Sequence, residues 1–181
     1  MSKPSHPLTK FLIVSVFSFF IGTVHGMLQV MPRIRHWLDA IGSPHSNPGH
    51  LIDPLAHAHM NLVGGVVLLS MCVTYYLLPL LSGKAIFSRR LIDLTFWFTT
   101  IGAYAFYAVQ MSFGIYEGML DLSGASDVAD AIEKFRGPAV AVSGTVMAAG
   151  FFCYLVNIGL TLRRRPEPGS ATAAIATRQM H

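Results

Sequence analysis

The stretch His57-Ala58-His59-Met60-Asn61 opens a long apolar run that continues through Gly64-Gly65 to Tyr75-Tyr76-Leu77-Leu78-Pro79. An imidazole at the threshold of a membrane-spanning helix is costly to bury, so each histidine needs a hydrogen-bond partner or a metal. Successive helical residues turn by about 100°, which places His57 and His59 roughly 200° apart around the helix axis. The spacing therefore predicts that the two side chains serve different centres on opposite flanks of one helix.

Composition identifies a membrane protein. Hydrophobic residues make up 52% of the 181 residues and charged residues only 12%, and the mean hydropathy is +0.51. Soluble domains carry about 25% charged residues. We therefore predict an all-α integral membrane four-helix bundle in contact with membrane lipid, with no separate soluble domain.

Four apolar runs predict the spanning helices. They cover approximately 11–31, 54–81, 91–115 and 139–162, between a polar segment at 1–10 and a basic, flexible tail at 163–181. The first run has about 20 residues, longer than the hydrophobic region of a signal peptide, so we interpret it as a span.

The connections also carry signals. We expect Pro32 to end the first helix and residues 33–53 to form a loop. Asp53 is expected to cap the second helix, with Pro54 at its first position. Residues 116–138 are predicted to be a loop that contains a short amphipathic surface helix from Asp121 to Arg136.

Basic residues predict the orientation, because they concentrate on the cytoplasmic side of membrane proteins. With the N-terminus inside, nine of them flank the inner ends of the helices, namely Lys3, Lys10, Lys84, Arg89, Arg90, Arg163, Arg164, Arg165 and Arg178, and only Arg33, Arg35, Lys134 and Arg136 lie outside. We predict a multi-pass protein of the prokaryotic cytoplasmic (inner) membrane with both termini cytoplasmic. No basic patch alternates with aromatic residues, so no nucleic-acid partner is expected.

This topology brings the candidate ligands into the outer half of the membrane. His25 precedes the outer end of its helix by about six residues, and His59 lies about five residues into the next helix, so their depths are similar at 1.5 Å per residue. Tyr104, Tyr107 and Glu117 of the third helix approach the same layer.

The residues around these histidines resemble a known family. The run from His57 to Pro79 is similar to the tenth helix of the catalytic subunit of the haem-copper oxidase superfamily, in its C-type cytochrome oxidase and nitric oxide reductase branches. Phe19-Phe20-Ile21-Gly22-Thr23-Val24-His25-Gly26 resembles the ninth helix. Two further segments resemble the eleventh helix, namely Ile101-Gly102-Ala103-Tyr104 and Phe113-Gly114-Ile115-Tyr116-Glu117-Gly118.

The resemblance implies haem iron as the ligand. In that family the first histidine of the pair binds the high-spin haem and the second binds the low-spin haem, which would make His57 and His59 the respective ligands. The chain resembles only the last four helices and lacks the family's other metal-binding histidines. We therefore expect a haem b-binding subunit for respiratory electron transfer, not gas reduction by this chain alone.

Two arrangements of the haem remain open. His59 and His25 would clamp one haem between the first two helices, or a partner would supply the missing ligands. The second arrangement implies a homo-oligomer or a subunit of a larger membrane complex, which the pairs Gly22/Gly26 and Gly144/Ala148 would help to pack.

Other functions are also considered. The alternatives to haem binding are a non-redox structural or assembly subunit and a copper-handling protein that uses Met27, Met31 and Met60. Copper is the weaker expectation, because methionines at helix ends usually fill space. His36, His45 and His50 lie in a polar loop and are expected to be solvated.

Overall fold

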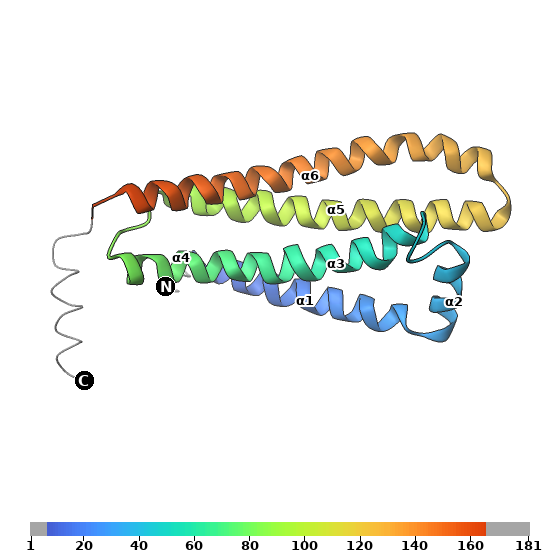
Figure 1. Ribbon diagram of the computed structural model, residues 1–181, viewed down its shortest axis with the longest axis horizontal. Coiled ribbons are helices and arrows are strands. Elements are labelled where there is room, and N and C mark those ends of the chain that lie inside the picture. Colours follow the sequence, from blue (N-terminus) through green and yellow to red (C-terminus); the bar gives the residue numbers. More distant parts are fainter. Residues whose placement is uncertain (1–6, 166–181) are drawn as a thin grey trace, which may run out of the picture.

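The computed structural model describes residues 7–165 and consists of four long helices and one short one (Figure 1). The first long helix is α1 (Thr9–Gln29), and the short α2 (Pro32–Ala40) follows it. The second long helix comprises the segments η1 (Leu51–Ala56), α3 (His57–His59), η2 (Met60–Val67) and α4 (Leu68–Ser82), where η denotes π-helical turns. The non-helical backbone of Asp53 interrupts it within η1. The third is α5 (Arg89–Ser123) and the fourth is α6 (Ser126–Arg163).

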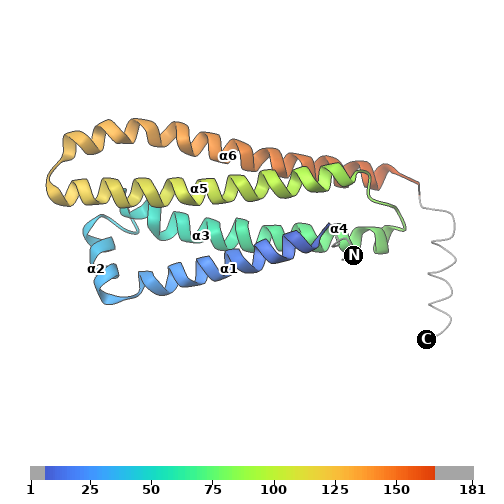
Figure 2. The ribbon, with the colours of Figure 1, turned by 180° about the vertical axis from the view of Figure 1, so that it is seen from behind.

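The helices run antiparallel, and the described chain starts and finishes at the same end of the bundle (Figures 1 and 2). The all-α prediction is confirmed. Three helical segments are long and apolar enough to cross a membrane, namely Thr9–Gln29, Leu51–Ser82 and Asp127–Arg163. Helix α5 is not among them, so a span at 91–115 stays a prediction. The side of the membrane on which each end of the bundle lies also stays a prediction. Residues 1–6 and 166–181, which belong to the predicted terminal segments, lie outside the described residues.

The prediction of a loop at 116–138 is wrong. Helix α5 continues to Ser123 and α6 begins at Ser126, so the expected amphipathic helix is mostly the first turns of α6. Gly124 makes this tight turn possible with a φ of +76°, and its N–H donates to the carbonyl of Asp121. A left-handed residue of this kind ends a helix and lets the chain reverse within a few residues.

Asp53 does not cap its helix as predicted. Its backbone is extended, at φ −128° and ψ 110°, as is usual for the residue before a helix, but its carboxylate does not bond to an N–H group of the turn that follows. The carboxylate instead accepts from Arg35 Nη1 at 2.7 Å and from Ser43 Oγ at 3.0 Å. Arg35 lies on α2, a helix that replaces part of the predicted loop, and Pro32 begins α2 instead of only ending α1. The hydrogen bonds that Arg35 donates to the carboxylates of Asp39 and Asp53 raise the pKa of its guanidinium.

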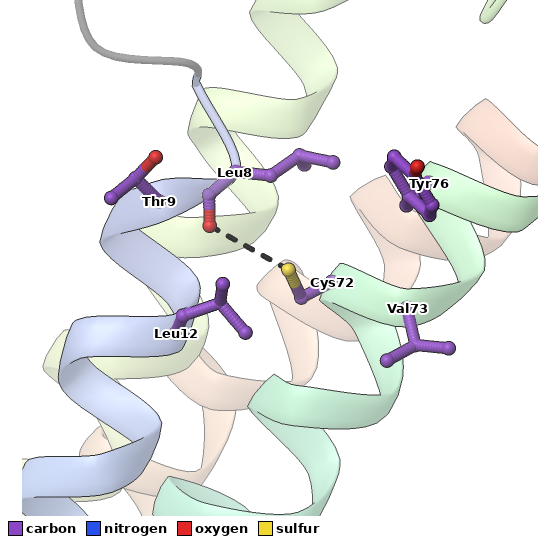
Figure 3. A pocket seen from close by; sticks show the side chains of 6 residues that line it. All are labelled: Leu8, Thr9, Leu12, Cys72, Val73 and Tyr76. Atoms are coloured by element: carbon purple, nitrogen blue, oxygen red, sulfur yellow. Dashed lines mark hydrogen bonds between the residues drawn. The ribbon is translucent and has the colours of Figure 1, made fainter.

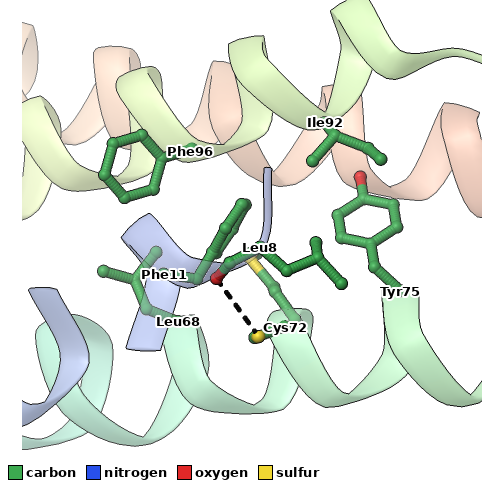
Figure 4. Close-up of a cluster of buried hydrophobic side chains, with 8 residues drawn as sticks. Leu8, Phe11, Leu68, Cys72, Tyr75, Ile92 and Phe96 are labelled. Carbon is green, nitrogen blue, oxygen red and sulfur yellow. Dashed lines mark hydrogen bonds between the residues drawn. The ribbon is translucent and has the colours of Figure 1, made fainter. Parts of the chain in front are cut away.

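The main apolar core lies at the end of the bundle where α1 begins. Buried side chains from α1, α4 and α5 meet there, and Phe11 and Leu68 are fully buried at its centre (Figure 4). Cys72 belongs to this core and is a free thiol. Burial of apolar surface here fixes the relative heights of the three helices.

Asn157 closes the same end of the bundle. Its side chain is fully buried on α6; Oδ1 accepts from the Ser88 N–H and Nδ2 donates to the Ser88 carbonyl, both at 3.0 Å. The amide therefore pairs both backbone groups of the residue that precedes α5.

We expect Asn157→Leu to lower the free energy of unfolding by about 1 to 3 kcal/mol, because it removes the partner of the half-buried Ser88 N–H and leaves the Ser88 carbonyl with only the bond from the Ile92 N–H. Thermal or denaturant unfolding in detergent would measure the change. Thr145→Val, at an exposed position of the same helix, is the control and should have little effect. Equal stability of the two variants would contradict the proposed role of the amide.

Candidate functional site

His57 and His59 point to opposite flanks of the second long helix, as their spacing predicts. The His57 ring lies against α1, with its centroid 5.6 Å from that of His25. The His59 ring lies against α5, with its centroid 4.4 Å from that of Phe106. The helix therefore separates two different surroundings.

His25 meets His57 and not His59. Gln29 Nε2 donates to His25 Nε2 at 3.1 Å, and His25 Nδ1 lies 3.3 Å from the hydroxyl of Tyr107 on α5. Both ring nitrogens of the buried His25 thus have protein partners. The structure therefore does not bring His25 and His59 together as the predicted clamp of one haem requires.

His57 packs edge-on against the backbone of α1. A Cβ atom added at Gly26 would lie 2.7 Å from Cε1 of the His57 ring, so only glycine allows this approach. Nδ1 of His57 is buried and has no hydrogen-bond partner among the described residues. An unpaired buried nitrogen is costly and marks a candidate functional position.

His59 has the hydrogen-bond pattern of a metal ligand. Its Nδ1 lies 2.9 Å from the carbonyl of Leu55. A carbonyl only accepts, so Nδ1 carries a proton, and in the neutral ring Nε2 is the nitrogen that keeps a lone pair. Metal-binding histidines usually donate their second N–H to a carbonyl or carboxylate in this way. Nε2 has no hydrogen bond to the described part of the chain.

The cavity that the described residues form beside His25 is small for a macrocycle. The cavity beside His25 and Trp37 measures about 170 Å³, whereas sites for ligands of drug size are typically about 300 to 1,000 Å³. Two larger hollows have no histidine in their lining. One, of about 360 Å³, lies between α1 and α4 (Figure 3), and the other, of about 520 Å³, lies between α5 and α6. Nε2 of His59 could therefore hold a haem iron, but neither of the two larger cavities of residues 7–165 lies beside this histidine.

The other sequence candidates lie apart from this layer or at the surface. His36 and His45 are exposed, and Nδ1 of His50 lies 2.6 Å from the carbonyl of Pro44. Met27 and Met31 are exposed whereas Met60 is buried. Within residues 7–165, no three histidine, cysteine or acidic side chains form a ready metal-binding set.

Sequence reasoning placed Tyr107 in the layer of His25, but it missed the other partner of His25, Gln29, and the partner of Glu117. Gln29 follows His25 by one helical turn, which was a usable signal. Arg136 pairs with Glu117 across α5 and α6. No sequence signal identifies that pair, because the predicted loop separated the two residues.

Comparison with known proteins adds a family relationship. A sequence profile of the family described as Cytochrome C and Quinol oxidase polypeptide I matches residues 4–148. The chain is 26% identical over 118 residues to the Cbb3-type cytochrome c oxidase subunit CcoN1 of Stutzerimonas stutzeri, a match that covers 64% of this chain and 23% of the relative. It is 22% identical over 179 residues to Cytochrome c oxidase subunit 1 of Rhodobacter capsulatus, covering 93% of this chain and 32% of the relative. The chain thus spans a third or less of the length of these curated relatives.

Proposed function

Because this chain belongs to the cytochrome c and quinol oxidase polypeptide I family, we propose that it is a haem b-binding subunit of a respiratory membrane complex. Its role is electron transfer and not gas reduction by itself. We place it in the prokaryotic cytoplasmic membrane, with both ends inside, because the basic residues favour that side.

The state of the His59 ring carries the proposal. With Nδ1 committed to the Leu55 carbonyl at 2.9 Å, Nε2 is the nitrogen left to bind iron. The flank next to Phe106 also provides an aromatic face against which a flat macrocycle would pack. A bis-histidine haem carries single electrons and has no open position for gas.

A partner supplies the rest of the site in this proposal. The second histidine and the remaining wall of the site would come from another subunit or a second copy, since neither of the two larger cavities of residues 7–165 has a histidine in its lining. His57 and His25 were also predicted as ligands. Each would first have to leave the contacts that hold its ring, namely Gly26 for His57 and the pair Gln29 and Tyr107 for His25.

We expect the protein purified in mild detergent from its native membrane to show a Soret band that shifts when dithionite is added. His59→Ala should abolish this band, because it removes the Nε2 atom that has no hydrogen bond to the described part of the chain. His36→Ala is the matched control, since His36 is exposed on α2, and should leave the spectrum unchanged. Absence of the band from the native protein, or its persistence in His59→Ala, would refute haem binding through this residue.

A structural or assembly subunit is the second candidate. The observation that favours it is the mutual packing of His25 and His57, in which His25 is fully hydrogen-bonded by protein groups. This reading expects no haem in the native complex, together with loss of the complex when α1 packing is disturbed. The optical spectrum therefore separates the two functions.

A further inference from the structure

Basic side chains gather at the end of the bundle where α5 begins and α6 finishes (Figures 1 and 2). The hydrogen bonds between Asn157 and Ser88, both at 3.0 Å, hold the two helix ends together there. Within 83–93 and 157–165, Asp93 is the one acidic residue, and it is paired with Lys10. Six positive charges therefore have no acidic counterpart in these segments: Lys84, Arg89, Arg90, Arg163, Arg164 and Arg165.

Two of these six side chains bind backbone groups of the protein. Nζ of Lys84 donates to the carbonyl of Leu162 at 2.6 Å. The guanidinium of Arg164 donates to two carbonyls of the connection that precedes α5, at 3.3 and 3.1 Å. The other four are exposed and form no ion pair or side-chain hydrogen bond with the described part of the chain: Arg89, Arg90, Arg163 and Arg165. Four guanidinium groups are thus free to bind an external anion.

An exposed apolar face of α5 begins at Arg90. Leu94, Trp97 and Ile101 follow it at helical spacing, so the four residues share one face of the helix. The three apolar residues are 42%, 55% and 53% exposed. From Arg90 to Ile101 the helix rises about 16 Å, close to half of the roughly 30 Å hydrocarbon layer of a bilayer. The face therefore has the length of one lipid leaflet and carries positive charge at its end.

We infer that this surface binds an anionic phospholipid, with arginine side chains around the phosphate and the acyl chains along Leu94, Trp97 and Ile101. Guanidinium groups suit phosphate because their planar fork donates two parallel hydrogen bonds. Clusters of about four to eight basic residues beside a membrane helix are typical of anionic lipid binding. The apolar face specifies a lipid, because free phosphate has no chains to cover it.

The neighbouring helix supports the depth that this inference requires. Helix α5 packs directly against α6 at Gly102, where an added Cβ would lie 2.4 Å from the backbone nitrogen of Met147. The segment Asp127–Arg163 of α6 is long and apolar enough to cross a membrane. The apolar face of α5 therefore lies in the same layer as the acyl chains. The inference does not depend on haem binding.

Trp97 serves as the reporter in the test. The chain has two tryptophans, so Trp37→Phe leaves Trp97 as the single indole. The full chain with this change is reconstituted in equimolar vesicles of phosphatidylglycerol and phosphatidylcholine, in which one lipid or the other carries bromine on its acyl chains. Bromine quenches tryptophan fluorescence on contact. We expect brominated phosphatidylglycerol to quench Trp97 more strongly than brominated phosphatidylcholine, because the anionic lipid occupies the face.

Arginine substitutions in the same background identify the headgroup contact. Arg90→Gln should weaken the binding of phosphatidylglycerol about fivefold, the contribution of one basic residue near a charged lipid surface. A series of vesicles with increasing phosphatidylglycerol content would measure this change. Arg33→Gln is the matched control, since it makes the same charge change at an exposed residue of α2, at the other end of the bundle. It should be quenched like the parent protein.

Four results would overturn the inference. Equal quenching by the two brominated lipids would show that the surface has no preference for the anionic one. Equal weakening by Arg33→Gln and Arg90→Gln would assign the preference to the overall charge of the chain. Absence of quenching by either lipid would show that another helix, such as one from a second copy, covers the face. Loss of the preference in inorganic phosphate, at constant ionic strength, would identify a simple anion site.

Discussion

Arg136→Ala is expected to lower the free energy of unfolding by about 3 to 5 kcal/mol, the usual cost of removing one partner of a buried ion pair. The side chains of Arg136 and Glu117 are 14% and 7% exposed, and the pair joins α6 to α5. Removing the guanidinium leaves the Glu117 carboxylate buried among Asp121 and Glu133 without a positive charge. Denaturant unfolding in detergent would measure the loss.

The loss should depend on pH with a definite sign. Without Arg136, burial raises the pKa of Glu117 in the folded state above its value in the unfolded chain. A carboxyl group with a raised folded-state pKa favours the fold when it is protonated, so stability is retained at low pH and lost as the pH rises through the folded-state pKa. The variant should therefore be closer to the native protein at pH 5 than at pH 8.

Two comparisons isolate the ion pair. Lys134→Ala removes a positive charge two residues away at an exposed position and should cost less than about 0.5 kcal/mol. The double variant Glu117→Gln with Arg136→Met removes both charges together and should recover much of the loss. If Lys134→Ala were as damaging as Arg136→Ala, general surface charge and not the buried pair would be responsible.

Gly102→Ala is expected to separate α5 from α6 and to lower the free energy of unfolding by about 1 to 3 kcal/mol, as overpacking of a close contact does. A Cβ atom at Gly102 would lie 2.4 Å from the backbone nitrogen of Met147 and 2.6 Å from its Cα. Backbone atoms cannot rotate away as a side chain can, so α6 must move. Gly150 makes the reciprocal contact, since its Cβ would lie 2.6 Å from the Thr99 nitrogen.

Gly144→Ala is the matched control for this prediction. It is the same substitution on α6, but among the described residues no atom outside the neighbouring helix backbone lies within 4 Å of the added Cβ. Alanine favours a helix over glycine by up to about 1 kcal/mol, so this variant should be neutral or slightly more stable. Equal losses in Gly102→Ala and Gly144→Ala would show that helix propensity, and not the close approach of two backbones, controls the result.

The glycine pairs also show where sequence reasoning was incomplete. Gly22/Gly26 and Gly144/Ala148 were both predicted to permit close helix contact. Gly22 and Gly26 do so within the chain, against Asn61 and His57. Gly144 has no such neighbour, so contact there with a second copy or a partner stays a prediction. Spacing identifies a small-residue face but not the helix that covers it.

The sequence predicted the positions of the long helices but not the full lengths of α5 and α6. The apolar runs located all four long helices, because a membrane-spanning stretch must pair its backbone within itself. The polar ends of α5 and α6 carry no such constraint in their sequence. Their continuation to Ser123 and from Ser126 depends on contacts between distant residues, of which the ion pair of Glu117 and Arg136 is one.

The sequence by itself determined that this is an all-α membrane protein and that His57 and His59 occupy opposite flanks of one helix, because both follow from hydropathy and from the fixed angle between helical residues. Only the tertiary structure decided that His25 meets His57 instead of His59. Antiparallel order sets the height of a side chain in the bundle, whereas its direction depends on how each helix is rotated about its own axis. That rotation is fixed by packing contacts such as the one between the His57 ring and the bare backbone of Gly26.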